Sequence, residues 1–257
     1  MPVNNILIVF GISSYIGYHL VQRVLAQGSY HQIIGIYRTD NEYTKYLSEL
    51  EGEPVRLIQN DIMYSNVAVE DYLSEQEKKT VRHISVLYAC GMWLSGPLSV
   101  EDRQNVDRVN AIGFVVPAKI VIDLLSWAAR SKNSIQFIAL TGLAGEKGAV
   151  KYNAIYNATV TALCNFCRAA ATEVAGTQSI VMAYSLGLFD KGQSYIHDLC
   201  KNLVIKKPLA IEKTIEPIAQ QLHDRNYCFN GAVVELADGL FNYQDACHYL
   251  HQPSNSP

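Results

Sequence analysis

Short apolar runs alternate along the chain with longer segments in which apolar residues recur every three or four positions. Runs of four to six residues that stop near Gly, Asn, Asp or Arg are typical of strands buried on both faces of a parallel sheet. The pattern predicts seven strands, over residues 6–10, 32–37, 55–58, 84–89, 135–140, 179–184 and 231–236.

The segments between these runs have helical spacing and predict helices over residues 16–27, 43–50, 67–78, 102–122, 152–174 and 216–223. Strands that alternate with helices fold as a doubly wound parallel sheet with helices on both faces and right-handed crossovers. We therefore expect a single Rossmann-type α/β domain over residues 1–250. The polar end of the chain, 251–257, is expected to be a disordered tail.

Composition narrows the possible partners. The chain has 257 residues, 49% of them hydrophobic, and a net charge of −3, and it lacks the basic runs of a nucleic-acid binder. No apolar run reaches the roughly 18 residues of a membrane span, and no signal peptide is recognised, so we expect a cytoplasmic protein without a membrane segment. The six cysteines are scattered, and Cys164 and Cys167 lie within a helical pattern, so we expect reduced core thiols and no metal site.

The first strand, turn and helix, residues 5–28, favour a phosphate site. Gly11 allows a tight turn, and the first N–H groups of the following helix carry the positive end of its dipole. The middle glycine of the usual dinucleotide fingerprints is missing, because Ser14 and Tyr15 occupy its place, but the hydroxyls of Ser13 and Ser14 can donate to phosphate instead. The same pattern also occurs in doubly wound proteins that bind no nucleotide. The predicted cofactor contacts here are Gly11, Ser13, Ser14, Ile16 and Gly17.

The residue after the second strand indicates which dinucleotide would bind. Arg38 stands there, and no acid follows until Asp40. An acid at this place binds the ribose 2′-hydroxyl, whereas an arginine accommodates a 2′-phosphate, so Arg38 favours NADP over NAD. The alternative is that Arg38 is an ordinary solvated loop arginine.

Two later strand ends complete the predicted cofactor site. Asp61 and Ile62 follow the third strand, where the Asp61 carboxylate can approach an adenine amino group, although a loop aspartate needs no ligand. The fourth strand ends in the small residues Ala89, Cys90 and Gly91, which let the backbone pass beneath a cofactor.

In their order and spacing these signals resemble the single-domain type of the short-chain dehydrogenase/reductase family over nearly the whole chain. The resemblance rests on these segments: Gly11 to Gly17, Ala89 to Gly91, Asp107 to Asn110 with Gly113, Leu143 to Gly145 with Gly148, Tyr156 to Thr159, Ser185 to Gly187, and Asp238 with Gly239.

The family's catalytic set of Asn, Ser, Tyr and Lys is only partly present. Asn110 matches the Asn and Tyr156 matches the Tyr, although a different register would make Tyr152 the acid. Gly142 stands in the serine position, with Thr141 one residue earlier. Val160 stands in the lysine position.

The lysine matters because a tyrosine of pKa about 10 is a poor proton donor until a nearby cation lowers its pKa. Losing a cation roughly 5 Å from a phenolate forfeits on the order of 3 kcal/mol, or about a hundredfold in rate. Lys147 or Lys151 in the preceding loop can substitute for it, or both are simply solvated loop lysines.

Two hypotheses follow. The first is an NADP-dependent reductase of a small-molecule or carrier-bound carbonyl, such as a β-ketoacyl group or another polar ketone. Tyr156 would donate the proton, Thr141 would orient the carbonyl, and Asn110 would hold backbone or water geometry. The second is a degenerate family member, because Tyr15, Gly142 and Val160 depart from the pattern together. Such a protein would be a non-catalytic subunit, or would perform dehydration, isomerisation or cyclisation in the same pocket.

The resemblance also implies an oligomer, since family members commonly associate through their long helices and last strand. The helix from residue 156 onward carries apolar residues around much of its circumference, which fits burial on two sides. We expect a homo-oligomer or a heteromer with a paralogous subunit.

Overall fold

The computed structural model describes residues 4–50, 54–63, 81–92, 94, 98, 103–142, 153–190 and 208–237. All described strands form one parallel sheet in the order β3-β2-β1-β4-β5-β6-β7. The strands are β1 (Asn4–Phe10), β2 (Gln32–Tyr37), β3 (Val55–Gln59), β4 (Val81–Tyr88), β5 (Ser134–Gly142), β6 (Ile180–Leu186) and β7 (Val233–Leu236). The predicted Rossmann-type sheet is thereby confirmed. The strand order reverses between β1 and β4, which is the place where open α/β sheets bind their ligands.

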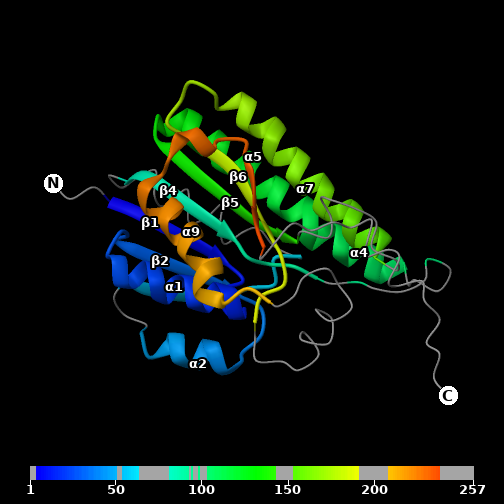
Figure 1. Ribbon diagram of the computed structural model, residues 1–257. Coiled ribbons are helices and arrows are strands. Elements are labelled where there is room, and N and C mark those ends of the chain that lie inside the picture. The colour runs from blue at the N-terminus through cyan, green and yellow to red at the C-terminus, as the bar shows by residue number, and fades with distance from the viewer. Residues whose placement is uncertain are drawn as a thin grey trace, which may run out of the picture.

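Helices cover both faces of the sheet (Figure 1). On one face lie α1 (Tyr15–Gln27), α2 (Glu42–Ser48) and α9 (Ile211–Asp224). On the other lie α4 (Arg103–Asn110), the π-helix η2 (Ala111–Val115), α5 (Val116–Ser131) and α7 (Ala154–Glu173). A short 3₁₀-helix, η3 (Tyr227–Phe229), precedes β7.

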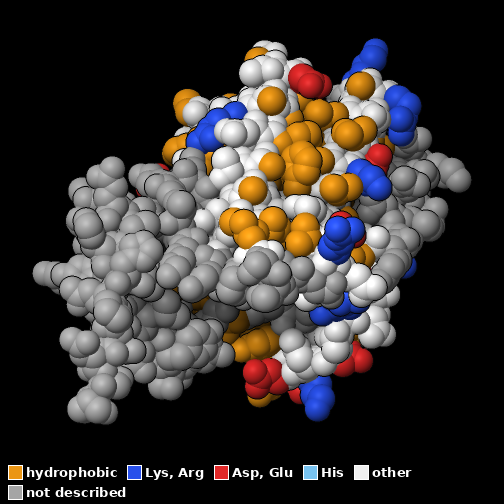
Figure 2. All heavy atoms as spheres, turned by 90° about the vertical axis from the view of Figure 1, so that its right-hand side faces the viewer, with side chains coloured by type: hydrophobic (Ala, Val, Ile, Leu, Met, Phe, Trp, Pro, Cys, Tyr) orange, Lys and Arg blue, Asp and Glu red, His pale blue; other side chains and the backbone are white. Residues whose placement is uncertain are grey.

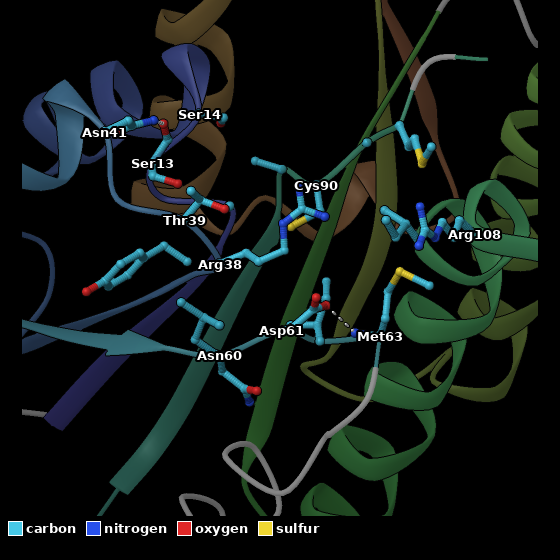
Figure 3. Close-up of a pocket in the computed structure, with 18 residues that line it drawn as sticks. Ser13, Ser14, Arg38, Thr39, Asn41, Asn60, Asp61, Met63, Cys90 and Arg108 are labelled. Atoms are coloured by element: carbon cyan, nitrogen blue, oxygen red, sulfur yellow. Dashed lines mark hydrogen bonds between the residues drawn. The ribbon is translucent and has the colours of Figure 1, made fainter. Parts of the chain in front are cut away.

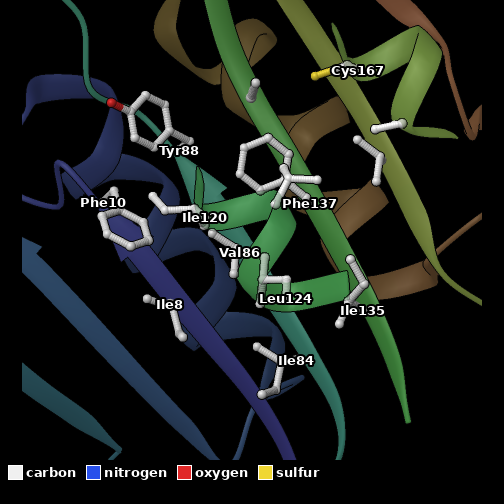
Figure 4. Close-up of a cluster of buried hydrophobic side chains, with 14 of the residues drawn as sticks. Ile8, Phe10, Ile84, Val86, Tyr88, Ile120, Leu124, Ile135, Phe137 and Cys167 are labelled. Atoms are coloured by element: carbon white, nitrogen blue, oxygen red, sulfur yellow. The ribbon is translucent and has the colours of Figure 1, made fainter. Parts of the chain in front are cut away.

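The alternation of side chains along each strand divides the apolar core between the two faces. In β1, Ile8 and Phe10 pack toward α5 and α7, whereas Leu7 and Val9 pack toward α1 and α9. Figure 4 shows the first of these clusters, in which side chains of β1, β4 and β5 meet those of α5 and α7. Both faces of the central strands are therefore buried, as their continuous apolar runs predict.

Helix boundaries differ most from the prediction where a proline interrupts the pattern. The helix predicted over 102–122 is α4, η2 and α5 in succession, and it continues to Ser131. Pro117 lies in the first turn of α5 and has no N–H to donate to the preceding turn. The helix has π-helical hydrogen bonding there, in η2. The helix predicted over 216–223 starts at Ile211 and accommodates Pro217. The helix predicted over 67–78 and the tail lie outside the described residues.

The stretch Arg103–Ser131 is long and apolar enough to cross a membrane by length and composition. Its side chains Ile120, Leu124 and Trp127 are fully buried within the protein. The same stretch carries the exposed apolar side chains Val115 and Ile122, so it is buried on one side only. Cys164 and Cys167 are buried free thiols of α7.

A buried polar network lies at the amino ends of β4 and β5. The His83 ring nitrogens lie 2.7 Å from Ser134 Oγ and 3.0 Å from Ser85 Oγ. Ser85 donates to Gln136 Oε1 at 2.9 Å and accepts from the Tyr30 hydroxyl at 2.8 Å. The Ser85 hydroxyl donates its proton to Gln136, so it can only accept from His83 Nε2. In a neutral ring Nδ1 then accepts from the Ser134 hydroxyl. Both hydrogen bonds are satisfied by a neutral imidazole.

Candidate functional site

The turn after β1 is built as the sequence predicts. Gly11 has φ +78°, and a Cβ on it would lie 2.8 Å from the carbonyl oxygen of Ala89. A Cβ on Gly17 would lie 2.4 Å from the carbonyl oxygen of Gly11. The Gly17 N–H donates to Ser14 Oγ at 3.0 Å, so Ser14 caps α1. The turn and the helix approach each other as closely as glycine allows.

A cavity of about 610 Å³ opens beside this turn, at the carboxyl ends of β1, β2, β3 and β4 (Figure 3). Most of the predicted cofactor contacts line it, namely Gly11, Ser13, Ser14, Arg38, Asp61, Ile62, Ala89, Cys90 and Gly91. Two do not line it: Ile16 is buried in the core, and Gly17 packs against Gly11. Parallel strands thus bring together residues that are up to 80 positions apart in the sequence.

The cavity holds charges of both signs. Figure 3 shows the Arg38 guanidinium pointing into it beside Cys90, with Asp61 on the neighbouring strand end. Burial raises the pKa of the Cys90 thiol to about 12, with Arg38 acting against this rise and Asp61 adding to it. The Cys90 thiol therefore lines the cavity in its neutral form and is not a nucleophile at neutral pH.

Nine of the residues that line the cavity were not among the predicted cofactor contacts, and Arg108 and Ile112 are two of them. Arg108 reaches the cavity from α4, on the wall opposite Arg38, and Ile112 lies one turn further on the same face. Among the described lining residues, the guanidinium groups of Arg38 and Arg108 therefore flank the cavity, and Asp61 brings a carboxylate. The helical spacing of Arg108 and Ile112 is a signal that could have found them.

Asn41 is another lining residue that was not predicted, and it joins two of the loops around the cavity. Its Nδ2 donates to the Ser13 carbonyl at 2.9 Å, while its Oδ1 accepts from the N–H groups of Tyr43 and Thr44 and caps α2. An asparagine directly before a helix is a typical N-cap, which the sequence could have shown. Asn41 holds the loop of Arg38 against the loop of Ser13.

Tyr156 faces the carboxyl end of β5. A Cβ built on Gly142 would lie 2.3 Å from the Tyr156 hydroxyl oxygen. Burial, with a smaller contribution from the Cys164 thiol, raises the pKa of Tyr156. Val160, one turn later on α7, is buried and brings no charge. Tyr152, Lys147 and Lys151 lie outside the described residues.

The Thr141 hydroxyl makes its contacts inside the core. It donates to the Tyr184 carbonyl at 3.2 Å and lies 3.6 Å from Cys164 Sγ. The side chain is buried between β5, β6 and α7. This placement argues against the carbonyl-orienting role predicted for Thr141, because the hydroxyl is already used inside the core.

Asn110 is tied to the helix that carries Tyr156. The Thr159 hydroxyl donates to Asn110 Oδ1 at 2.7 Å. Gly113 leaves room for this contact, since a Cβ there would lie 2.4 Å from Thr159 Cγ2. The π-helix thus docks on α7 through Thr159, and the predicted role of Asn110 in backbone or water geometry stays a prediction.

Tyr15, in place of the middle glycine, packs among aromatic rings. Its ring is stacked on Phe189 with a centroid distance of 6.2 Å and contacts His19 at 4.6 Å. Tyr43 of α2 lies 6.2 Å away. Tyr15 therefore links α1 to α2 and to the segment after β6.

Comparison with known proteins identifies the family of the chain. The family described as short chain dehydrogenase matches residues 5–194. No curated protein sequence matches the chain significantly.

Solved structures of similar fold cover almost the whole chain. A 4-hydroxyisoleucine dehydrogenase complexed with NADH is 16% identical, with 93% of this chain and 99% of that chain covered and a TM-score of 0.77. A serine dehydrogenase from Escherichia coli is 16% identical, with 91% and 97% covered and a TM-score of 0.71. A blue fluorescent protein from a metagenomic library in complex with NADPH is 18% identical, with 93% and 98% covered and a TM-score of 0.77.

Proposed function

Because this chain belongs to the short-chain dehydrogenase family, we propose that it reduces a polar ketone, small or carrier-bound, with NADPH. The observation that carries the proposal is the cavity of about 610 Å³ at the sheet's switch point, into which Arg38 points. Similar folds were solved with NADH and with NADPH, which supports a nicotinamide cofactor. The bound cofactor would supply a hydride to the carbonyl carbon.

The described residues fit such a cofactor. The cavity has the size of an ordinary ligand pocket, and α1 has no acid in its first turn to repel a pyrophosphate. Arg38, with Ser13 and Thr39 beside it, would hold the 2′-phosphate, and Asp61 would face the adenine. A side chain at Gly11 or Gly17 would collide with backbone, so the cradle depends on both glycines.

The protein's own part in the reaction is to place and protonate the carbonyl oxygen. Tyr156 is the proton donor, held on α7 at the end of β5. Asn110 accepts from Thr159 and so fixes α4 and η2 against the helix of the acid. Without a cation at Val160, catalysis rests on positioning more than on a lowered tyrosine pKa.

Replacing Arg38 with alanine is expected to weaken NADPH binding about thirtyfold and to leave NADH binding unchanged. A charge-assisted hydrogen bond to phosphate contributes about 2 kcal/mol, and only NADPH carries the 2′-phosphate. Fluorescence titration of both nucleotides measures this. Arg56→Ala, an exposed arginine of β3, is the matched control. Equal affinities of the wild type for NADPH and NADH would contradict the assignment.

A second candidate function is favoured by the loss of two catalytic groups around Tyr156. Val160 brings no cation, and Gly142 brings no hydroxyl. A non-catalytic subunit of a hetero-oligomer, or a pocket for dehydration, isomerisation or cyclisation, needs neither group. Transfer of a hydride to a ketone separates this candidate from the reductase.

We also propose that the protein associates through α5 and α7. Figure 2 shows hydrophobic side chains gathered on the face that forms the right-hand side of Figure 1, where these helices lie. Ile122 is 57% exposed and Val115 41% exposed. Phe114 and Phe166 lie nearby in edge contact, with ring centroids 6.0 Å apart. A second copy, or a paralogous chain, would bury this face.

The variant Ile122→Glu is expected to dissociate the oligomer into monomers. A carboxylate at the centre of an apolar interface loses its hydration without gaining a partner, which weakens association by about a hundredfold or more. Light scattering after size-exclusion chromatography measures the mass. Lys45→Glu on α2, an exposed residue of the other helix layer, should leave the mass unchanged. A monomeric wild-type protein would refute the proposal.

A further inference from the structure

The hydroxyl of Tyr156 stands in the space that any side chain at position 142 would need. A Cβ on Gly142 would lie 2.3 Å from Tyr156 Oη, but 3.3 Å from Cζ and 3.4 Å from Cε1 of the same ring. The collision is therefore with the hydroxyl, and the ring carbons stay near ordinary contact distance. No backbone strain is involved, since Gly142 does not have a positive φ.

The side chains of Thr141 and Val160 do not bring a second polar group to the space beside Gly142. The Thr141 hydroxyl, one residue before Gly142, is turned toward the Tyr184 carbonyl and Cys164 Sγ. Val160 is buried one turn beyond Tyr156 and offers neither a hydroxyl nor a charge. At Gly142 the hydroxyl group therefore comes from α7 and not from β5.

We infer that Gly142 is a positioning residue that admits the Tyr156 hydroxyl to the end of β5, where one phenol both orients the substrate carbonyl and protonates it. The placement stands on its own, whereas the catalytic part rests on the proposed function. A serine at position 142 would displace the tyrosine rather than assist it. The Tyr156 hydroxyl can therefore occupy this position only because position 142 has no serine side chain.

The Tyr156 hydroxyl alone accounts for the proton that the reaction requires. The bound dihydronicotinamide would supply a hydride from C4 to the carbonyl carbon, which would oxidise the cofactor and reduce the ketone. The electron pair of the C=O π bond takes the proton of Tyr156 Oη. The phenolate then takes a proton from water.

A thermal double-mutant cycle tests the placement without any need for activity. Gly142→Ala is expected to lower the melting temperature by about 5 °C, because the new methyl group must displace the packed, half-buried Tyr156 side chain. In a Tyr156→Phe background the same alanine is expected to change it by about 1 °C or less, because the colliding oxygen is gone and alanine suits a strand better than glycine. Gly91→Ala, where a Cβ meets nothing within 4 Å, is the thermal control.

Kinetics of the same variants test the catalytic part. Gly142→Ala and Gly142→Ser are both expected to lower kcat for ketone reduction by about a hundredfold, with the Kd for NADPH unchanged. The serine variant is decisive, because it restores the family's hydroxyl and is nevertheless expected to be slower than the wild type.

The outcomes are separable. If the alanine costs as much stability in the Tyr156→Phe background as in the wild type, the placement is wrong. If Gly142→Ser is as fast as the wild type, the catalytic part is wrong. If the thermal cycle behaves as expected but no ketone is reduced by the NADPH-bound wild type, the placement holds and the proposed function fails.

Discussion

Replacing Tyr156 with phenylalanine is expected to lower kcat for NADPH-dependent ketone reduction by about a thousandfold. The phenol is the group that the fold presents at the carboxyl end of β5, and its hydroxyl fills the space at Gly142. The alternative hydroxyl, that of Thr141, is bound to the Tyr184 carbonyl. The three atoms nearest to a Cβ on Gly142 all belong to Tyr156, so little residual proton donation is expected without its hydroxyl.

Stopped assays with NADPH and a panel of ketones measure this effect, and a fluorescence titration shows that the Kd for NADPH is unchanged. Tyr227→Phe, an exposed tyrosine of η3, should keep the wild-type kcat. Retention of more than about a tenth of the rate in Tyr156→Phe would remove the tyrosine from the mechanism.

The same residue should also determine how the rates of reduction and oxidation depend on pH. Burial raises the pKa of Tyr156 above its ordinary value of 10.0, so the phenol keeps its proton throughout the neutral range. Ketone reduction, which needs the protonated phenol, should lose rate only above pH 10. Alcohol oxidation needs the phenolate and should be slow at neutral pH.

The second large effect is on stability in acid. The free energy of unfolding is expected to fall by about 4–5 kcal/mol between pH 7.5 and pH 3 through His83 alone. Burial, followed by the charge of Arg225, lowers the pKa of His83 from 6.5 to about 3. In the unfolded chain the imidazole takes up a proton as the pH falls through 6.5, whereas the folded protein excludes it. The unfolded state therefore binds more protons across this window, and stability is lost as the pH falls.

The network around His83 explains why the folded protein excludes the proton. Its ring lies between the hydroxyls of Ser134 and Ser85, and the Ser85 proton is directed at Gln136. Protonation would charge a ring that has almost no exposed surface. It would also turn Nδ1 into a donor, so the hydrogen bond with Ser134 would have to reverse its direction.

Urea unfolding at pH 7.5 and pH 4.5 measures the effect while most carboxylates remain ionised. The wild type should lose about 3 kcal/mol through His83 over this range, and His83→Gln should lose correspondingly less, because glutamine keeps hydrogen-bonding groups but does not titrate. His31→Gln, an exposed histidine, should keep the wild-type slope. Equal slopes for His83→Gln and the wild type would contradict the account.

The strand ends could be predicted from the sequence because their positions follow from the apolar runs. Gly11 and Arg38 follow their runs directly, Ala89 ends its run and Asp61 stands three residues after its run. Parallel pairing brings all four to one edge of the sheet. The apolar runs were therefore sufficient to predict that these four residues meet at this edge of the sheet.

Other features depend on side-chain direction and on contacts between distant elements. Thr141 shares a face with Phe137 and Ala139 in β5, and both pack toward the layer of α5 and α7. The strand's period of two could therefore have shown that Thr141 turns into the core. The approach of Tyr156 to Gly142 has no such pattern, because it depends on how α7 lies across the end of β5.

Transfer of deuterium tests the central claim most directly. The wild-type protein is incubated with ketones and NADPH that carries deuterium at C4 of the nicotinamide, and the alcohols are analysed by mass spectrometry. We expect deuterium on the carbinol carbon with the wild type and at most traces with Tyr156→Phe. Tight binding of NADPH without any deuterated alcohol would contradict hydride transfer, and would leave the cavity to a non-redox or non-catalytic role.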